Sequence, residues 1–367
     1  MLAGTAAAGA SLRVGLLETD PHGVLAAAAG GRPRSLVVVG AGGSSAAGDL
    51  VAACAGRGSS VPVVTVGGPG LPGWVGPLDL VVAVSASGSS PETLAAVGEA
   101  ARRGAHVVGV GCGGPLFDAV VDARGVVLGI GRPPEPTPAR LLLWRLAAPV
   151  LLLAAELGLV EVTRGAVAAA ADELDAVALA CGPAAELGGN PAKDAALLCA
   201  EGIPLIWGTP GVPAAAARRF ARQLAENAGV AALHGALPEV ARTHARVLAG
   251  HWSDEGDLFR DRTGDAVARR PSLTLLREGE CDRLSADLAD TSASLARAAG
   301  IPTTELDAGE GNPLMRFVRL AGPLDFASVY CAVALGSDPA GTAAQLDPSL
   351  GSAVAAVTSP TYDRRSN

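Results

Sequence analysis

Hydrophobic residues in the first half of the chain form short continuous runs, separated by longer stretches with a helical pattern. Five runs rich in Val, Leu and Ile cover residues 36–42, 61–66, 79–88, 106–114 and 126–131. Such runs are typical of parallel strands that helices cover on both faces. The pattern therefore predicts an α/β fold with a parallel sheet.

The same rhythm returns in the second half. Helical patterns at 141–158 and 161–180 precede expected strands at 203–211, 272–276 and 303–308. The strand–turn stretches VVVGAGGSS and PLIWGTPG occupy corresponding places in the two halves, which indicates a weak internal repeat. We expect two tandem α/β domains, residues 1–158 and 159–367, each a parallel sheet flanked by helices.

Turns rich in hydroxyl groups follow two of the predicted strands. GAGGSSAAGDL follows the first strand, and SASGSSPET follows the third. A helix N-terminus offers unpaired N–H groups and a partial positive charge, and serine adds hydroxyl donors, so together they can hold a phosphate. The alternative is an ordinary capping turn, with Ser89 or Ser90 as N-cap and Glu92 in the first helical turn.

The turns lack features of the motifs that bind dinucleotides and nucleoside triphosphates. Gly40 and Gly42 supply two glycines of a dinucleotide-binding pattern, but Ser45 stands in the third place. The next strand ends without the acidic residue that would hold a ribose, and no Gly-Lys-Ser/Thr follows. A small phosphoester is therefore favoured over a nicotinamide dinucleotide or a nucleoside triphosphate.

Composition sets the broad class of protein. Hydrophobic residues make up 49% of the 367 residues, and the net charge of −8 comes without a long basic run, so we expect a large core and no nucleic-acid partner. Six scattered cysteines without a Cys-x-x-Cys pair favour free thiols in a reducing cytoplasm. The N-terminus lacks the basic start of a signal peptide. The apolar stretch 141–160 contains Arg145, Pro149 and Glu156, which favours a buried helix over a membrane span.

The serine turns resemble a sugar isomerase (SIS) domain, and CGGPL at 112–116 adds to the likeness. The stretches 190–229 and 323–341 resemble the bifunctional phosphoglucose/phosphomannose isomerases of bacteria and archaea, and the motifs follow that family's order over most of the chain. The resemblance implies two SIS domains, a homodimer, and isomerisation of mannose 6-phosphate or glucose 6-phosphate with fructose 6-phosphate as the ketose. It implies no cofactor, no metal and no membrane partner.

The resemblance also implies roles for particular residues. Arg140 falls on the family's active-site arginine, suited to stabilising an enediolate, and Glu226 in QLAENAG falls on the proton-transfer glutamate. Without the resemblance, each would be an ordinary helix-surface charge. The substrate phosphate would lie against the following residues of the turns: Gly42, Gly43, Ser44, Ser85, Ser87 and Ser90.

One position departs from the family. Where the family carries its ring-opening histidine, the stretch PEVARTHARVL has Arg242, which cannot act as a base near neutral pH. His244 follows two residues later, a step of about 200° on a helix. Two hypotheses stay open: His244 serves in ring opening, or the protein is a noncatalytic phosphosugar-binding or regulatory SIS protein.

Two expectations concern segments outside these motifs. His244, His251, Asp254 and Glu255 do not fit the spacing of a standard zinc site, so we expect no metal there. The tail after GSDPAG lacks the charged helix that ends the family, and we expect it to be disordered.

Overall fold

A computed structural model of the chain describes residues 1–68, 70–133, 137–248, 270–279 and 281–341. Two compact units emerge: a first unit, Ala10–Ala168, and a second unit, Met1–Gly9 with Ala169–Pro339. Each unit is described by itself. The expectations for His251, Asp254, Glu255 and the tail fall outside the described residues.

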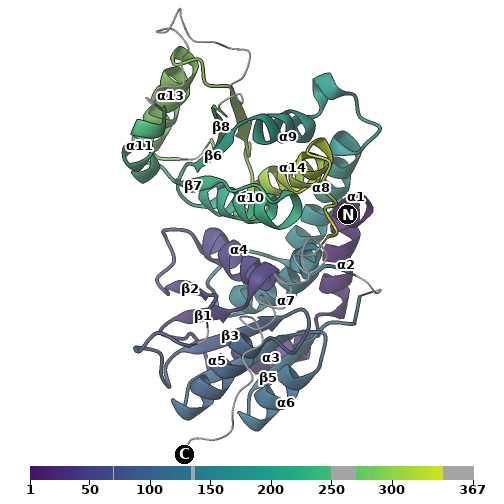
Figure 1. The fold of residues 1–367 in the computed structure, drawn as a ribbon. Helices are drawn as coiled ribbons and strands as arrows, with labels where there is room; N and C mark the ends of the chain where they lie inside the picture. Colours follow the sequence, from purple (N-terminus) through teal and green to yellow (C-terminus); the bar gives the residue numbers. More distant parts are fainter. Residues whose placement is uncertain (69, 134–136, 249–269, 280, 342–367) are drawn as a thin grey trace, which may run out of the picture. The chain divides into compact units, whose positions relative to one another are not determined.

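The first unit is built on a five-stranded parallel sheet of order β2-β1-β3-β4-β5 (Figure 1). This confirms the parallel α/β architecture that the apolar runs predict. The strands are shorter than those runs, because the glycine- and serine-rich ends of the runs form turns. Their bounds are β1 Leu36–Val39, β2 Val63–Val66, β3 Leu80–Ser85, β4 His106–Gly111 and β5 Val126–Gly129.

Helices cover both faces of this sheet. On one face, α5 and α6 pack against β3, β4 and β5; α4, α7 and α3 pack together on the other. Alternating side chains of β1 serve the two faces: Val37 and Val39 belong to the core under α5 and α6, whereas Val38 faces α4 at Gly48. The bounds are α2 Ala8–Glu18, α3 Pro21–Ala28, α4 Ala46–Ala55, α5 Pro91–Arg102, α6 Pro115–Asp122 and α7 Leu143–Glu156.

The apolar stretch 141–160 contains helix α7, which is a buried helix. Most of its residues are buried, including Pro149 in its interior. Its Arg145 forms an ion pair with Glu18 at the end of α2, with Nε 2.9 Å from Oε2. The segment is a core helix of the first unit, as predicted, and its arginine is neutralised where it leaves the core.

The second unit has a four-stranded parallel sheet of order β7-β6-β8-β9. β6 lies between the strand that follows it and β8, just as β1 lies between β2 and β3, so the internal repeat is one of topology. The short strand β7 was not predicted, because LHGA is not an apolar run. The bounds are β6 Ile203–Gly208, β7 Leu233–Ala236, β8 Pro271–Arg277 and β9 Thr303–Asp307.

The helices of the second unit again form two layers. On one face, α14 packs against both α9 and α10; α11, α12 and α13 share a core with the other face. Among the described residues, α14 alone is long and apolar enough to cross a membrane by length and composition, but 78% of its most apolar window is buried. The bounds are α1 Leu2–Ala6, α8 Arg164–Cys181, α9 Pro191–Glu201, α10 Val212–Ala228, α11 Glu239–Thr243, α12 Ala245–Leu248, α13 Arg283–Ala298 and α14 Pro313–Ala334.

The chain divides into the two compact units at other residues than the predicted boundary between 158 and 159. Residues 159–168 belong to the first unit, where Arg164 donates to the carbonyl oxygens of Leu16 and Thr19. The first nine residues belong to the second unit because α1 packs against α14. Neither contact leaves a signal in the local hydrophobic pattern.

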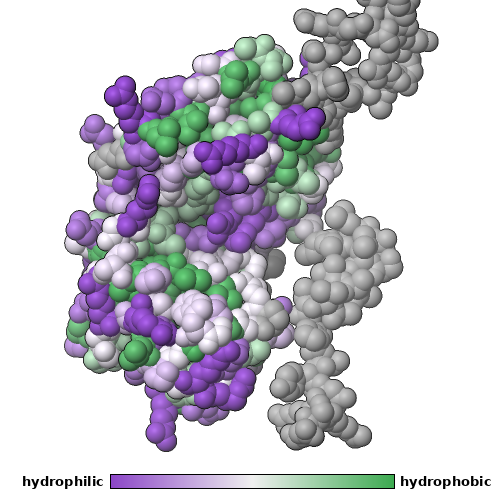
Figure 2. All heavy atoms as spheres, turned by 90° about the vertical axis from the view of Figure 1, so that its left-hand side faces the viewer, coloured by the Kyte–Doolittle hydropathy of each residue, from purple (hydrophilic) through white to green (hydrophobic). Residues whose placement is uncertain are grey.

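The surface carries both hydrophobic and hydrophilic residues. On the face drawn in Figure 2, hydrophobic patches lie between hydrophilic side chains. Large exposed apolar side chains include Leu17 and Leu179, at 79% and 83% exposure. All six cysteines are free thiols, four of them buried.

Candidate functional site

The turn between β3 and α5 gathers serine hydroxyls into one cluster. Ser85 ends β3 and is buried; its Oγ lies 3.1 Å from Ser90 Oγ and 3.4 Å from Ser87 Oγ. The backbone N–H of Gly88 donates to Ser85 Oγ at 3.0 Å. Ser87 is exposed at the rim. The cluster thus presents rotatable hydroxyl donors beside the N-terminus of a twelve-residue helix.

The capping alternative is only half correct. Ser90 is the N-cap residue of α5 by position, with extended backbone angles, but its side chain makes no capping hydrogen bond. Its hydroxyl lies instead against Ser85. The first N–H groups of α5 are therefore not satisfied by the serine that precedes them, and they stay available to an anion.

The turn after β1 lies beside this cluster. Gly42–Ser45 form a single 3₁₀ turn, η1, that leads into α4, and Ser44 is buried within it. The N–H of Ala86, in the other turn, donates to Ser44 Oγ at 3.3 Å. Since β1 and β3 are neighbours in the sheet, their carboxyl ends bring both serine turns to one edge. All four predicted serines are in this place.

Arg140 reaches the same edge from a distant part of the sequence. It lies in the 3₁₀ turn η2, Ala139–Leu142, which packs against η1. A Cβ atom on Gly43 would come within 2.8 Å of Arg140 Cα, so only glycine allows this approach. The structure therefore brings Arg140 together with Gly42, Gly43 and the serines, and its side chain is half-buried.

A third turn fixes the serine cluster from the other side. Gly88 has φ +68°, and a Cβ there would lie 1.8 Å from the carbonyl oxygen of Gly113 in the CGGPL stretch. The N–H of Leu116 donates to the carbonyl of Gly88 at 2.9 Å. The glycines of this motif thus let two strand-end turns touch through their backbones, which holds the hydroxyls in position.

Glu226 belongs to the second unit and is exposed near the end of α10. Its neighbours face the other way: Asn227 donates to Ser328 Oγ at 2.8 Å, and the Gln223 amide lies 3.1 Å from the same oxygen. One turn earlier, Arg219 forms a buried bidentate ion pair with Asp325, both contacts being 2.8 Å. This network fixes α10 on α14 and leaves Glu226 on the outer face.

His244, the other candidate of the second unit, is engaged in packing. It caps the end of α11, and the indole Nε1 of Trp207 donates to its Nδ1 at 3.2 Å. Because an indole only donates, Nδ1 must be unprotonated, and burial lowers the pKa of His244 below its ordinary value of 6.5. Arg242 is exposed on the preceding helix. This geometry favours a structural role for His244; no sequence motif signals its pairing with the strand tryptophan.

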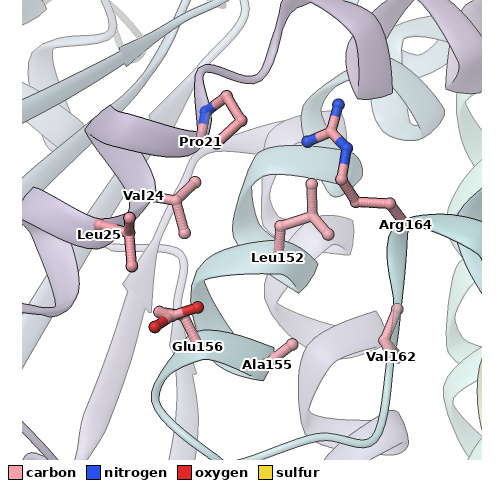
Figure 3. A pocket seen from close by; sticks show the side chains of 8 residues that line it. All are labelled: Pro21, Val24, Leu25, Leu152, Ala155, Glu156, Val162 and Arg164. Carbon is pink, nitrogen blue, oxygen red and sulfur yellow. The ribbon is translucent and has the colours of Figure 1, made fainter.

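The first unit also has a surface hollow away from the serine turns. A hollow of about 390 Å³ lies between α3, the end of α7 and the start of α8 (Figure 3). Its wall is mainly apolar, with Glu156 and Arg164 apart on its rim, and the guanidinium of Arg164 already donates to two carbonyl oxygens. Among the described residues, no cluster of three metal-ligating side chains occurs.

Comparison with known proteins finds a matching family and a related protein, both concerned with sugar phosphate isomerisation. Residues 189–344 match the family described as the bacterial phospho-glucose isomerase C-terminal SIS domain. The chain is 23% identical, over 304 residues, to a bifunctional phosphoglucose/phosphomannose isomerase from Caldicellulosiruptor bescii, covering 83% of this chain and 85% of the relative.

Solved structures share the fold over nearly the whole chain. The C-terminal domain of glucosamine-fructose-6-phosphate aminotransferase from Francisella tularensis aligns with a TM-score of 0.61 at 16% identity, covering 91% of this chain and 96% of its own. Tagatose-6-phosphate ketose/aldose isomerase from Escherichia coli gives 0.62 at 13% identity, covering 90% and 92%. The family match identifies residues 189–344 as an SIS domain, and the chain, with its two parallel sheets, resembles bifunctional phosphoglucose/phosphomannose isomerase.

Proposed function

We propose that the protein is a phosphosugar aldose–ketose isomerase that interconverts mannose 6-phosphate or glucose 6-phosphate with fructose 6-phosphate. The observation that carries the proposal is the cluster of Ser44, Ser85, Ser87 and Ser90 beside Arg140. It supplies neutral donors for a phosphate and a cation for the anion that forms during isomerisation. The similarity to a phosphoglucose/phosphomannose isomerase supports the choice of sugar.

The chemistry assigns one task to each part. The serine hydroxyls and the N–H groups of α5 bind the phosphate dianion. The carboxylate of Glu226 takes the proton from C2 of the open-chain aldose and returns it to C1. The proton of the C2 hydroxyl passes to the C1 oxygen, so that the C1 carbonyl becomes a hydroxyl and a carbonyl forms at C2. The Arg140 guanidinium stabilises the enediolate between these two proton transfers. No electron leaves the substrate, so no redox cofactor enters this scheme.

A coupled assay with each aldose phosphate, reading out fructose 6-phosphate, tests the enzyme proposal. Glu226→Gln should lower kcat by roughly 10²–10⁴-fold, the range for loss of a general base, with the fold unchanged by circular dichroism. Ser87→Ala should weaken substrate binding by about tenfold, the equivalent of one phosphate hydrogen bond. Turnover of the wild-type protein no faster than that of the Glu226→Gln variant would contradict the proposal.

A second candidate function is phosphosugar binding without turnover. Two observations favour it: Arg242 stands where the related isomerases have histidine, and His244 is paired with Trp207. In that case sugar phosphates raise the melting temperature in a Ser87-dependent manner, while no ketose forms. Detection of any ketose that depends on Glu226 rules this function out.

We further propose that the protein acts in the cytoplasm as a homodimer. The exposed leucines are compatible with an interface. Sedimentation equilibrium should give about twice the 36.2 kDa chain mass, and a single-chain mass at micromolar concentration argues against the dimer.

A further inference from the structure

The first unit holds a second, larger cavity at the edge of its sheet opposite the serine turns. Its volume is about 700 Å³. The first residues of three strands line it: Leu80 of β3, His106 of β4 and Val126 of β5. Because the strands are parallel, this is the amino-terminal edge, whereas the serine turns occupy the carboxyl-terminal edge. The cavity is therefore separate from the proposed active site.

Three cationic or protonatable side chains line this cavity: Arg32, His106 and Arg124. In the part of the chain that the structure describes, none of the three side chains has a hydrogen bond or an ion pair, and no Asp or Glu lines the cavity. Asp79, beside the start of β3, is already ion-paired with Arg34. On a chain of net charge −8, an unpaired positive cavity is an unusual local charge.

Arg124 has an unusual backbone conformation. Arg124 has φ +56°, and it is the only non-glycine residue with positive φ in the described residues. It directly follows the C-cap of α6. At comparable helix ends the chain has glycine: Gly104 after α5 and Gly158 after α7, with φ +71° and +68°. An arginine at this position therefore has a backbone cost that glycine would avoid.

The rest of the cavity wall suits an organic ligand. It is formed by small and apolar residues from the end of α3 and the turn before β3, including Ala26, Pro77 and Leu78. The chain after α3 lies against the His106 ring, since a Cβ on Gly30 would be 3.9 Å from Nε2, an ordinary contact distance. Positive groups at one part of a hollow and apolar walls at another match a phosphate carried on a larger group.

We propose that this cavity binds a phosphate-bearing small molecule, with Arg32, His106 and Arg124 as its ligands. The proposal does not depend on the proposed function, because it uses no residue of the serine turns. The nearby carbonyl ends of helices α3 and α6 disfavour an anion, so the side chains supply the attraction. Interaction with those helix ends is the competing explanation for the two arginines.

Calorimetric titration of the full chain with inorganic pyrophosphate and with adenosine diphosphate, at low and moderate salt, tests this. Arg124→Gly is the decisive variant, because glycine relieves the backbone and keeps or raises the melting temperature. We expect it to weaken binding of the probe by about tenfold or more. Arg32→Ala should do the same, whereas Arg283→Ala, at a 94% exposed arginine outside the cavity, and Ser87→Ala should not.

Each result decides the question. Tighter binding of adenosine diphosphate than of pyrophosphate shows that the apolar wall contributes, and equal affinity shows that the phosphate groups alone are bound; both support the site if Arg124→Gly weakens them. An affinity that Arg124→Gly leaves within twofold overturns the proposal. So does binding that is lost in Ser87→Ala instead, or the absence of heat with both probes in the wild-type chain.

Discussion

At the scale of single residues, glycine decides whether the serine turns can form. Gly43 admits the backbone of Arg140, and Gly88 admits the carbonyl of Gly113. Both are close approaches between parts of the chain that are far apart in sequence. The hydroxyl groups were recognisable from the sequence, but the reason for the glycines beside them appears only when the partner backbone is in place.

We predict that Gly88→Ala destabilises the first unit by roughly 2–5 kcal/mol, because it combines a left-handed backbone with overpacking against a backbone oxygen. Urea unfolding measures the change. Gly58→Ala is the matched control: Gly58 is exposed with nothing within 4 Å of the added methyl group, so its effect should stay within about 0.5 kcal/mol. Equal effects from the two substitutions would show that the described contact is wrong.

His244 makes stability depend on pH. Its folded pKa lies below the ordinary 6.5, so as pH falls the unfolded chain binds the proton first. The contribution of neutral His244 is therefore fully present above about pH 7 and is lost as pH falls through 6.5 and on through the lowered folded pKa.

We predict that the free energy of unfolding falls less steeply between pH 7.5 and 5.5 in His244→Gln than in the wild-type protein, because glutamine can accept the Trp207 hydrogen bond without titrating. Denaturant titrations followed by tryptophan fluorescence at each pH measure this. Identical pH profiles would remove His244 as the responsible group.

At the scale of elements, the second unit depends on how α10 is fixed to α14. The Arg219–Asp325 pair is buried, with side chains 6% and 9% exposed. The alanine-rich pattern of α10 predicts a helix but does not indicate that polar residues are on its buried side. Gln223, Asn227 and Arg219 are all buried there. The resemblance of these three residues to the isomerase motif thus has a structural explanation, whereas Glu226 is exposed on the same helix.

We predict that Asp325→Ala destabilises the protein by about 3–5 kcal/mol, because it leaves the guanidinium of Arg219 buried without its partner. Arg283→Ala removes an exposed charge whose partner Asp287 is 3.8 Å away, and should cost less than about 1 kcal/mol. The double variant Arg219→Met with Asp325→Leu should recover much of the loss. If the double variant is no better than Asp325→Ala, the unpaired charge is not the cause.

At the scale of the whole molecule, one topology is used twice with different chemistry. β6 takes the place of β1, yet its turn carries Thr209, Pro210 and Gly211 where the first unit has a glycine–serine turn. The proposed phosphate site is thus confined to the first unit, and the proposed proton-transfer residue comes from the second. Because the proposed site residues come from both units, we expect that neither unit performs the proposed isomerisation alone.

The sequence determined the fold class, because continuous apolar runs have few solutions other than buried parallel strands. It also determined the four serines and Arg140 as candidates, since turn composition and motif order are local properties. The tertiary structure alone decided three further points. Arg140 lies against Gly43, although about a hundred residues separate them; His244 pairs with Trp207; and Arg124 has a glycine-like backbone beside an unpaired positive cavity. Each depends on a contact between distant segments, and hydrophobic periodicity carries no information about which segments meet.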